Sequence, residues 1–299
     1  MTTESTPKMT SNQRLSIEQV QHYQDFGYVV ASSGLDDRLL SRMDEELDGW
    51  IELSRNYDAN FGETVDGKAR FDLEVGHTRE VPRLRRVANP ADISEVFQEV
   101  LWDGPIVDMV SQLVGPNVRY HHCKLNIKLP NMETRVYYHQ DQSYDPHTND
   151  DMLAILLMLD DTSEKNGCLR VVPGSHKERY SHFQNGQYVG AIDSSFTAEF
   201  NRRAASIIAK RGDICFMHCW TVHGSEINRS DQGRRLLICD YNAADSYPLL
   251  PPALPSRFSG KIVRGKPSPV ARLRDAEIEM RTPYSQDSFF EIQGQPSAT

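Results

Sequence analysis

The stretch GPNVRYHHCKLNIKL, residues 115–129, marks the point at which the chain changes from helical to strand-like. Glycine and proline end the helical periodicity that precedes them. Apolar and polar residues then alternate, as in a strand whose two faces meet different surroundings. One face carries Cys123, Leu125, Ile127 and Leu129, and the other carries His122, Lys124, Asn126 and Lys128. Such a polar face indicates either a strand that lines a wet cavity or an edge strand with one solvated face.

Downstream of this strand, short apolar runs separated by Pro, Gly, Asn and Asp turns predict further strands. These runs are residues 135–139, 152–159, 169–172, 206–208, 214–217 and 235–241. Their spacing is typical of a β-sandwich or barrel. Residues 248–269, with six prolines, predict an extended tail that crosses the surface.

Upstream of residue 115 the chain predicts helices. A capping box at Ser16–Gln19 begins a short helix that should run to about Asp25, before a first strand at 26–30. Apolar residues at helical spacing predict a second helix over 36–51 and further helical segments over 93–113. Helices first and strands later imply a helical layer packed outside a β core.

Residues 54–91 are polar and lack a clean period, so they predict a long irregular segment. Loops of that length in a compact domain are usually functional or mobile, and we expect this one to be a lid. The whole chain then reads as mainly β with flanking helices. We expect a flexible tail at 1–14 and a single domain at 15–290, made of a helical buttress and lid (about 15–115), a β core (about 116–245) and a C-terminal extension (about 246–290).

The composition limits the class of protein. In 299 residues, 33 Lys and Arg stand against 42 Asp and Glu, a net charge of −9 that argues against a nucleic-acid binder. The chain has no apolar run of the ~20 residues that span a bilayer, and its polar start has no signal-peptide core. Five cysteines without Cys-x-x-Cys spacing favour a reducing compartment. We expect a soluble cytoplasmic protein with neither nucleic-acid nor membrane partners; an oligomer is possible but not readable from the sequence.

The histidines carry the chemistry. His139-Gln-Asp141 places two metal-type ligands at i and i+2, on one face of a strand. With 10 His and 42 acidic residues in 299, about 10 × 42/299 ≈ 1.4 such pairs arise by chance, and His176-Lys-Glu178 is a second one. The first pair gains weight because an apolar strand delivers His223 downstream, and Arg234 follows 11 residues later. Two imidazoles and a carboxylate form the facial triad of non-haem Fe(II) oxygenases, and an Arg fork suits a dicarboxylate cosubstrate.

These motifs resemble the phytanoyl-CoA dioxygenase-like family of Fe(II)- and 2-oxoglutarate-dependent oxygenases. The resemblance covers about residues 15–245. The matching stretches are Tyr138–Asp141, Asn166–Leu169 with Pro173–Lys177, Gly212-Asp213, His223–Ser225, Asn228, Ser230 and Arg234-Arg235, together with the opening Gly27–Val30. The fold that the resemblance implies is a double-stranded β-helix, a jelly-roll or cupin-like core buttressed by N-terminal helices.

The resemblance also implies roles for single residues. His139, Asp141 and His223 match the family's iron ligands, and Arg234, assisted by Ser225, matches the residue that holds the distal carboxylate of 2-oxoglutarate. In the family the polar strand contacts the cosubstrate, so Lys124, Asn126 and His122 are candidates. The cofactors implied are Fe(II), 2-oxoglutarate as cosubstrate and O2. One departure is Leu156, which stands where the founding member has a tryptophan in the cosubstrate pocket.

The resulting hypothesis is a dioxygenase that hydroxylates an unactivated C–H bond of a small molecule and releases succinate and CO2. Desaturation, epoxidation or ring formation would use the same ligands. A zinc hydrolase and a non-catalytic jelly-roll binding protein are the alternatives from other classes. The hydrolase gives no purpose to Arg234 or to the polar strand, and in the binding protein an intact triad would be surplus. Specificity should lie in loops 54–91 and 177–205. The cluster Arg79, Arg83, Arg85 and Arg86 is either a solvated face or an anchor for an anionic substrate group.

Overall fold

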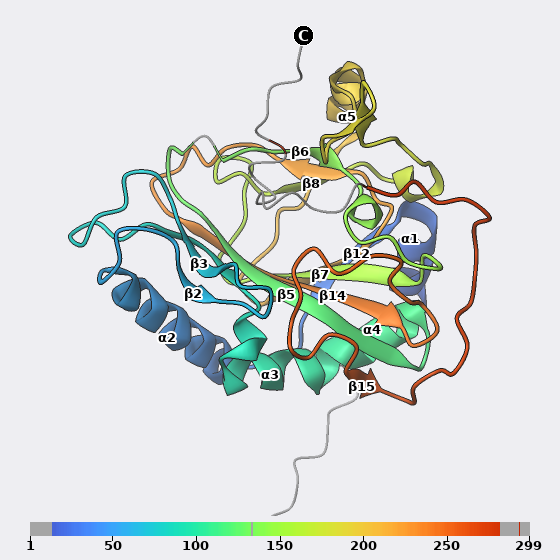
Figure 1. The fold of residues 1–299 in the computed structure, drawn as a ribbon, viewed down its shortest axis with the longest axis horizontal. Coiled ribbons are helices and arrows are strands. Elements are labelled where there is room, and N and C mark those ends of the chain that lie inside the picture. The colour runs from blue at the N-terminus through green and yellow to red at the C-terminus, as the bar shows by residue number, and fades with distance from the viewer. Residues whose placement is uncertain (1–13, 133, 282–292, 294–299) are drawn as a thin grey trace, which may run out of the picture.

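The computed structural model describes residues 14–132, 134–281 and 293. Its core is a double-stranded β-helix in which a large antiparallel sheet faces a smaller one (Figure 1). The large sheet has the order β1-β12-β7-β14-β5-β4-β3-β2, with β15 also paired to β5. Its strands are β1 (Tyr28–Ser32), β12 (Asp213–His218), β7 (Met152–Met158), β14 (Arg234–Ala243), β5 (Val118–Lys128), β4 (Leu84–Ala88), β3 (Ala69–Leu73), β2 (Phe61–Glu63) and β15 (Ile262–Arg264).

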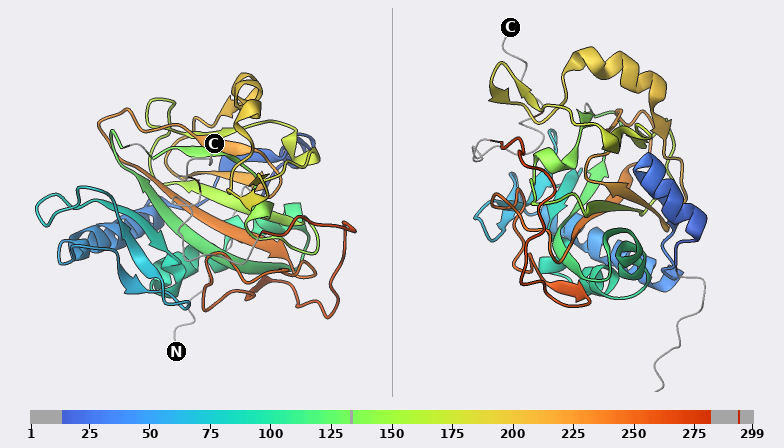
Figure 2. Two further views of the ribbon diagram at one scale, coloured as in Figure 1. Left: turned by 45° about the horizontal axis from the view of Figure 1, so that its top comes forward. Right: turned by 90° about the vertical axis from the view of Figure 1, so that its right-hand side faces the viewer.

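The small sheet has the order β11-β8-β13-β6. Its strands are β11 (Ala205–Ser206), β8 (Leu169–Val171), β13 (His223–Ser225) and β6 (Val136–His139). A separate two-stranded hairpin, β9 (Phe183–Gln184) and β10 (Gln187–Tyr188), and helix α5 (Thr197–Arg203) lie on the side of the small sheet (Figures 1 and 2). The expectation of a mainly β protein with a jelly-roll core is thus confirmed.

Four helices precede the β core, as the periodicity predicts. They are α1 (Ile17–Phe26), α2 (Asp37–Ser54), α3 (Glu95–Trp102) and α4 (Pro105–Val114). Helix α1 begins at the predicted capping box, in which Ser16 accepts a hydrogen bond from the Gln19 N–H. It ends at Gly27, whose φ of 82° suits glycine, and a Cβ there would lie 2.5 Å from the Thr221 hydroxyl.

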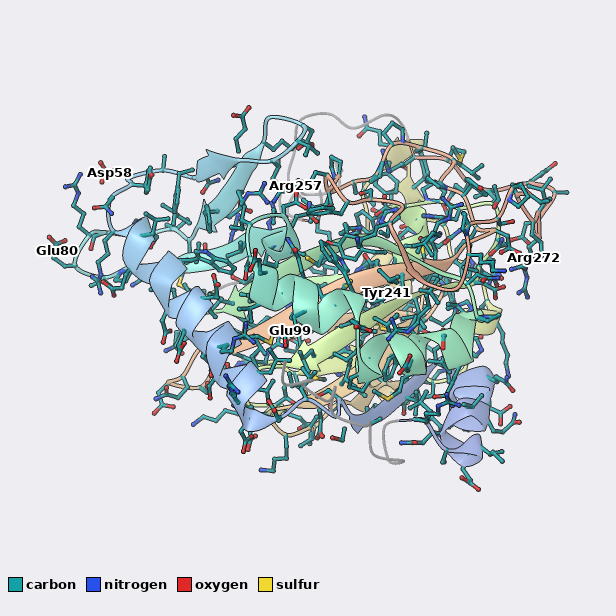
Figure 3. All side chains as sticks on the ribbon, turned by 90° about the horizontal axis from the view of Figure 1, so that it is seen from below. Asp58, Glu80, Glu99, Tyr241, Arg257 and Arg272 are labelled. Carbon is teal, nitrogen blue, oxygen red and sulfur yellow. The ribbon has the colours of Figure 1, made fainter. Side chains whose placement is uncertain are left out.

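Helices α2, α3 and α4 cover the outer face of the large sheet, as Figure 3 shows from below. The alternation predicted for β5 sorts its side chains between two surroundings. Cys123, Leu125 and Ile127 are buried in the same apolar cluster as the helix residues Met43 and Phe97. The opposite face of β5 looks toward the small sheet. The strand therefore lines an interior space rather than forming a solvated edge.

Residues 54–91 correct one expectation, because they are not an irregular segment. Strands β2, β3 and β4 extend the large sheet beyond β5. Phe71 lies opposite Val87 on the face that packs into the apolar core, and Asp72 lies opposite Arg86 on the face toward the interior cavity. Each strand has only three to five residues, so its alternation was too short to stand out against the polar turns. Any lid must therefore be confined to the turns between these strands.

The C-terminal extension is mostly irregular, as its prolines predict, but β15 within it pairs with β5. The tail at 1–13 and most residues after Arg281 lie outside the described residues. In the ranges that the structure describes, no helix combines the length and apolar character needed to cross a membrane.

Candidate metal and cosubstrate site

A cavity of about 100 Å³ lies between the two sheets. Its walls come from strands of both, together with the start of the short 3-10 turn Asp141–Ser143. The polar residues that line it are Arg85, Arg86, Lys124, Asn126, Lys128, Thr134, His139, Asp141, His223, Ser225, Arg234 and Asp240. Every residue predicted for the iron or the cosubstrate lines this cavity, except His122.

The three predicted iron ligands converge at one end of this group. Asp141 Oδ1 lies 3.5 Å from His139 Nε2 and 3.6 Å from His223 Nε2. The two imidazole rings are tilted, with centroids 4.1 Å apart. Strand pairing explains the approach, because His223 of β13 is the register partner of His139 of β6. Gly224 allows it, since a Cβ there would lie 2.7 Å from the carbonyl oxygen of Val136.

Backbone carbonyls orient both imidazoles. His139 Nδ1 lies 2.9 Å from the Tyr137 carbonyl oxygen, and His223 Nδ1 lies 3.0 Å from that of Thr221. If each Nδ1–H donates to its carbonyl, each Nε2 presents its lone pair to the space beside Asp141. This is the tautomer that metal-ligating histidines use.

Electrostatics agree with a ligand role. Burial, together with His139, lowers the pKa of His223 to about 4, so this ring is neutral near pH 7. Burial would raise the pKa of the Asp141 carboxyl, but His223, His139 and Lys124 outweigh it and keep this pKa below its ordinary value. His223 and Asp141 thus have the protonation states that bind a divalent cation, a neutral imidazole and a carboxylate.

The donor set fits one metal ion. His139, Asp141 and His223 form a group whose ligand atoms all lie within 4.8 Å of one another. Two ligands about 2.1 Å from a metal and at right angles are about 3.0 Å apart, so the two separations between Asp141 and the histidines need to contract by only about 0.5 Å. Two imidazoles and one carboxylate leave coordination positions open, as redox chemistry with O2 and a chelating cosubstrate requires.

Arg234 and Lys128 lie side by side on the large sheet, where they are register partners in β14 and β5. Arg234 is only 5% exposed, and its Nε is buried without a hydrogen-bond partner among the described residues. Lys128 Nζ donates to Ser225 Oγ at 2.7 Å and to the Glu226 carbonyl oxygen at 2.5 Å. Burial and the charge of Arg234 lower the pKa of Lys128 to about 6. The buried Arg234 cation, the Lys128 amine and the Ser225 hydroxyl thus face one space. This arrangement suits a carboxylate, whose negative charge would favour the protonated form of Lys128.

Arg235 points the other way, as the strand alternation predicts. Its guanidinium makes a bidentate ion pair with Asp160, with the shortest contact at 2.6 Å, and a second pair with Asp44 at 2.9 Å. The arginine that the eleven-residue offset from His223 selects, Arg234, is therefore the one that lines the cavity. Lys128, by contrast, lay on the predicted polar face but was not recognised as a site residue. Its register opposite Arg234 would have identified it.

Lys124, Asn126 and Leu156 lie in the cavity wall. The amide oxygen of Asn126 is buried and has no hydrogen-bond partner within the described part of the chain. His122 differs from its prediction. It does not line the cavity, because its Nε2 lies 2.9 Å from Asp240, and Asp240 is the residue that reaches the cavity wall.

The arginine cluster divides into two pairs. Arg85 and Arg86 line the cavity, whereas Arg79 is 64% exposed and Arg83 contacts the Val75 carbonyl. The competing His-x-acid motif plays no part in the cavity. The ring of His176 lies against helix α1, with Nε2 3.1 Å from the Gln24 carbonyl oxygen.

Comparisons with known proteins show the family of this chain. The family model of phytanoyl-CoA dioxygenase (PhyH) matches residues 23–236. A probable alpha-ketoglutarate-dependent hypophosphite dioxygenase of Stutzerimonas stutzeri is 32% identical over 92% of this chain and 96% of its own length. The peroxisomal phytanoyl-CoA dioxygenase of Homo sapiens is 25% identical, over 79% of this chain and 71% of its own.

Solved structures show the same fold. EctD from S. alaskensis superposes with a TM-score of 0.67 at 21% identity, over 88% of this chain and 91% of that one. EctD has also been solved with bound Fe and with 2-oxoglutarate and 5-hydroxyectoine. With the family match spanning most of the β core and the relatives covering nearly the whole chain, this protein belongs to the phytanoyl-CoA dioxygenase family and is an Fe(II)- and 2-oxoglutarate-dependent dioxygenase of small molecules.

Proposed function

We propose that His139, Asp141 and His223 hold the iron, and that the enzyme oxygenates a small oxyanion. Arg234, with Ser225 and Lys128, binds the C5 carboxylate of 2-oxoglutarate. Lys124 and Asn126 contact the cosubstrate nearer the metal. Arg85 and Arg86 bind the anionic substrate.

The observation that carries the substrate class is the combination of a small cavity with a cationic lining. Sites for drug-sized ligands occupy roughly 300–1,000 Å³, whereas this cavity has about 100 Å³. Three arginines and two lysines line it, against the carboxylates of Asp141 and Asp240. After 2-oxoglutarate is bound, little space remains, and Arg85 and Arg86 are the cationic side chains of the wall that have no role at the iron or the cosubstrate. A small anion satisfies both conditions.

Arg85 and Arg86 both lie near carboxylates of the segment around β3. Arg86 makes a 2.7 Å ion pair with Asp72, whereas Arg85 lies 4.0 Å from both Asp72 and Glu74. The side chains of Arg85 and Arg86 are 19% and 13% exposed, so an anion between them would be largely desolvated. Charge-assisted hydrogen bonds are strongest in such surroundings.

The names of two relatives support this class. The hypophosphite dioxygenase of Stutzerimonas stutzeri aligns over nearly its whole length, and a 2-aminoethylphosphonate dioxygenase is 24% identical over 75% of this chain. Both named substrates are phosphorus anions. With hypophosphite the reaction balances as one O2 consumed, one oxygen atom entering succinate and one inserted into a P–H bond, with CO2 and phosphite released.

The test is succinate release by the full chain with Fe(II), 2-oxoglutarate and a panel of hypophosphite, phosphite, 2-aminoethylphosphonate and L-proline. We expect one of the phosphorus anions to stimulate release, with its oxygenated product seen by 31P NMR. Arg85→Gln should raise KM for that anion at least tenfold and leave KM for 2-oxoglutarate within a few-fold. Arg79→Gln, on the exposed side of the same segment, is the control and should change neither constant.

Stimulation by L-proline alone would show that the substrate is not an oxyanion, and the family assignment would stand. A full loss of 2-oxoglutarate turnover in Arg85→Gln would instead place this arginine at the cosubstrate.

A further inference from the structure

A second histidine cluster lies beside the cavity, on the other side of Asp240. It consists of His121, His122 and Asp145, which are 4%, 4% and 8% exposed. One ring nitrogen of each histidine and one carboxylate oxygen of Asp145 all lie within 4.8 Å of one another. None of the three lines the cavity of the iron site, so the chemistry proposed above does not use them.

His122 is held as a metal-ligating histidine is held. Its Nε2 lies 2.9 Å from Asp240 Oδ2, and its Nδ1 lies 2.6 Å from His121 Nδ1. When Nε2–H donates to the Asp240 carboxylate, Nδ1 is left with a lone pair that faces His121. A carboxylate behind an imidazole fixes the tautomer and the orientation of the ring.

The neighbouring nitrogens are incompletely satisfied. His121 Nε2 and His147 Nε2 are both buried and have no hydrogen-bond partner among the described residues. His147 Nδ1 lies 2.7 Å from the Asp145 carbonyl oxygen, and its ring packs 5.0 Å from that of His121. Burial lowers the pKa of His121 and of His147, so both rings are neutral and have a lone pair to offer. A buried polar atom left unpaired costs about 1–3 kcal/mol.

We propose that His121, His122 and Asp145 bind a divalent transition-metal ion of the zinc class, at a site separate from the iron site. Imidazole and carboxylate ligands suit such an ion. Two nitrogens bound to zinc at about 2.05 Å in tetrahedral geometry lie about 3.3 Å apart, so the two rings would separate by about 0.7 Å on binding.

The surroundings give this ion a structural role. Asp145 Oδ1 accepts a hydrogen bond from the Ala253 N–H at 2.8 Å, and the His121 carbonyl oxygen accepts one from Ser259 Oγ at 2.8 Å. A metal here would tie β5 and the loop after Asp141 to the C-terminal extension. It would also fix Asp240, through His122, in the wall of the catalytic cavity. Structural ions of this kind add directly to folding stability.

The test is made in a variant without the iron site, so that a failure of the zinc proposal does not affect the proposed function. In the double variant His139→Ala/His223→Ala, bound zinc is counted by elemental analysis after equilibrium dialysis against Zn²⁺, and thermal unfolding is followed with and without Zn²⁺. We expect one equivalent of zinc and a zinc-dependent rise of several degrees in Tm.

Adding Asp145→Asn to the double variant keeps an oxygen acceptor for the Ala253 N–H. It should abolish both the binding of zinc and the zinc-dependent rise in Tm. His121→Gln should do the same, and His176→Gln, a histidine outside the cluster, should change neither. No zinc in the double variant would overturn the proposal, and so would an equivalent that survives both cluster substitutions. In either case the 2.6 Å contact of the two rings would be a hydrogen bond between them.

Discussion

Replacing Arg234 by leucine should separate the cosubstrate site from the stability of the fold. Arg234 is buried, and the described residues include no carboxylate within 4 Å of it. Its positive charge is therefore unfavourable until an anion binds, and burial accordingly lowers its pKa to about 10. We expect Arg234→Leu to unfold at the same temperature as wild type or higher when no ligand is present.

The same substitution should strongly weaken the binding of 2-oxoglutarate. Truncating one partner of a buried, hydrogen-bonded charge pair costs about 2–5 kcal/mol, and a central value of about 3 kcal/mol is roughly a 100-fold rise in Kd. At a 2-oxoglutarate concentration of 100 times the wild-type Kd, ligand stabilises wild type by about 2.7 kcal/mol and the variant by only about 0.4 kcal/mol. For a domain of this size, 2-oxoglutarate should therefore raise the Tm of wild type by about 5 °C and that of the variant by about 1 °C.

Arg235→Leu is the matched control on the next residue. It removes the ion pairs with Asp160 and Asp44, whose side chains are each 26% exposed, so we expect a loss of about 1–2 kcal/mol of stability without ligand. Its Kd for 2-oxoglutarate should stay within a few-fold of wild type. The assay is thermal unfolding with Fe(II) under argon, with and without 2-oxoglutarate, together with calorimetric titration.

Two results would contradict the reasoning. If Arg235→Leu loses the cosubstrate and Arg234→Leu loses stability, the register of β14 is wrong by one residue. If neither variant changes Kd, the cosubstrate does not bind between Arg234 and Lys128.

Three further outcomes are expected. Asp141→Ala should lose bound iron on dialysis and lose coupled succinate release, whereas Glu178→Ala should keep both; near-native coupled turnover in Asp141→Ala would remove Asp141 from the ligand set. The free energy of unfolding of the ligand-free protein should rise with pH above about 6, by up to about 1.4 kcal/mol per pH unit, because unfolded lysine keeps a proton that folded Lys128 has lost. Urea unfolding at pH 6 and pH 9 should show a smaller rise for Lys128→Met than for wild type. If the free energy of unfolding rises equally with pH in both proteins, Lys128 is charged in the folded state. If the turn at 75–82, where Val75 is 81% exposed, acts as a lid, protease cleavage there should slow when substrate and 2-oxoglutarate are added together, and unchanged cleavage would show a static turn.

The sequence predicted most of the site because its chemistry is carried by short-range spacing. His139 and Asp141 are two residues apart, and Arg234 and Arg235 occupy opposite faces of one strand, so alternation alone decides between them. The polar face of β5 was readable for the same reason. In each case the spacing along the chain determines the position in space.

What the sequence did not predict depends on contacts between distant segments. His122 shares the polar side of its strand with Lys124, yet Asp240 of β14 holds it out of the cavity. Residues 61–88 become strands because β5 offers an edge for pairing, not because their own three- to five-residue alternation is strong. Predicting such features requires knowing which strand pairs with which, and the sequence of a single strand does not give its partner.

The two sheets carry different parts of the proposed site, and this separation has a mechanical consequence. The proposed iron ligands come from β6, β13 and the turn between β6 and β7, whereas Arg234 and Lys128 lie on β14 and β5 of the opposite sheet. A dicarboxylate that reaches from one group to the other acts as a strut across the sandwich. It would hold the two layers at a fixed spacing, and its own length would set that spacing. A shorter or longer diacid would then be rejected by the elastic resistance of the whole β core, beyond any mismatch at the arginine.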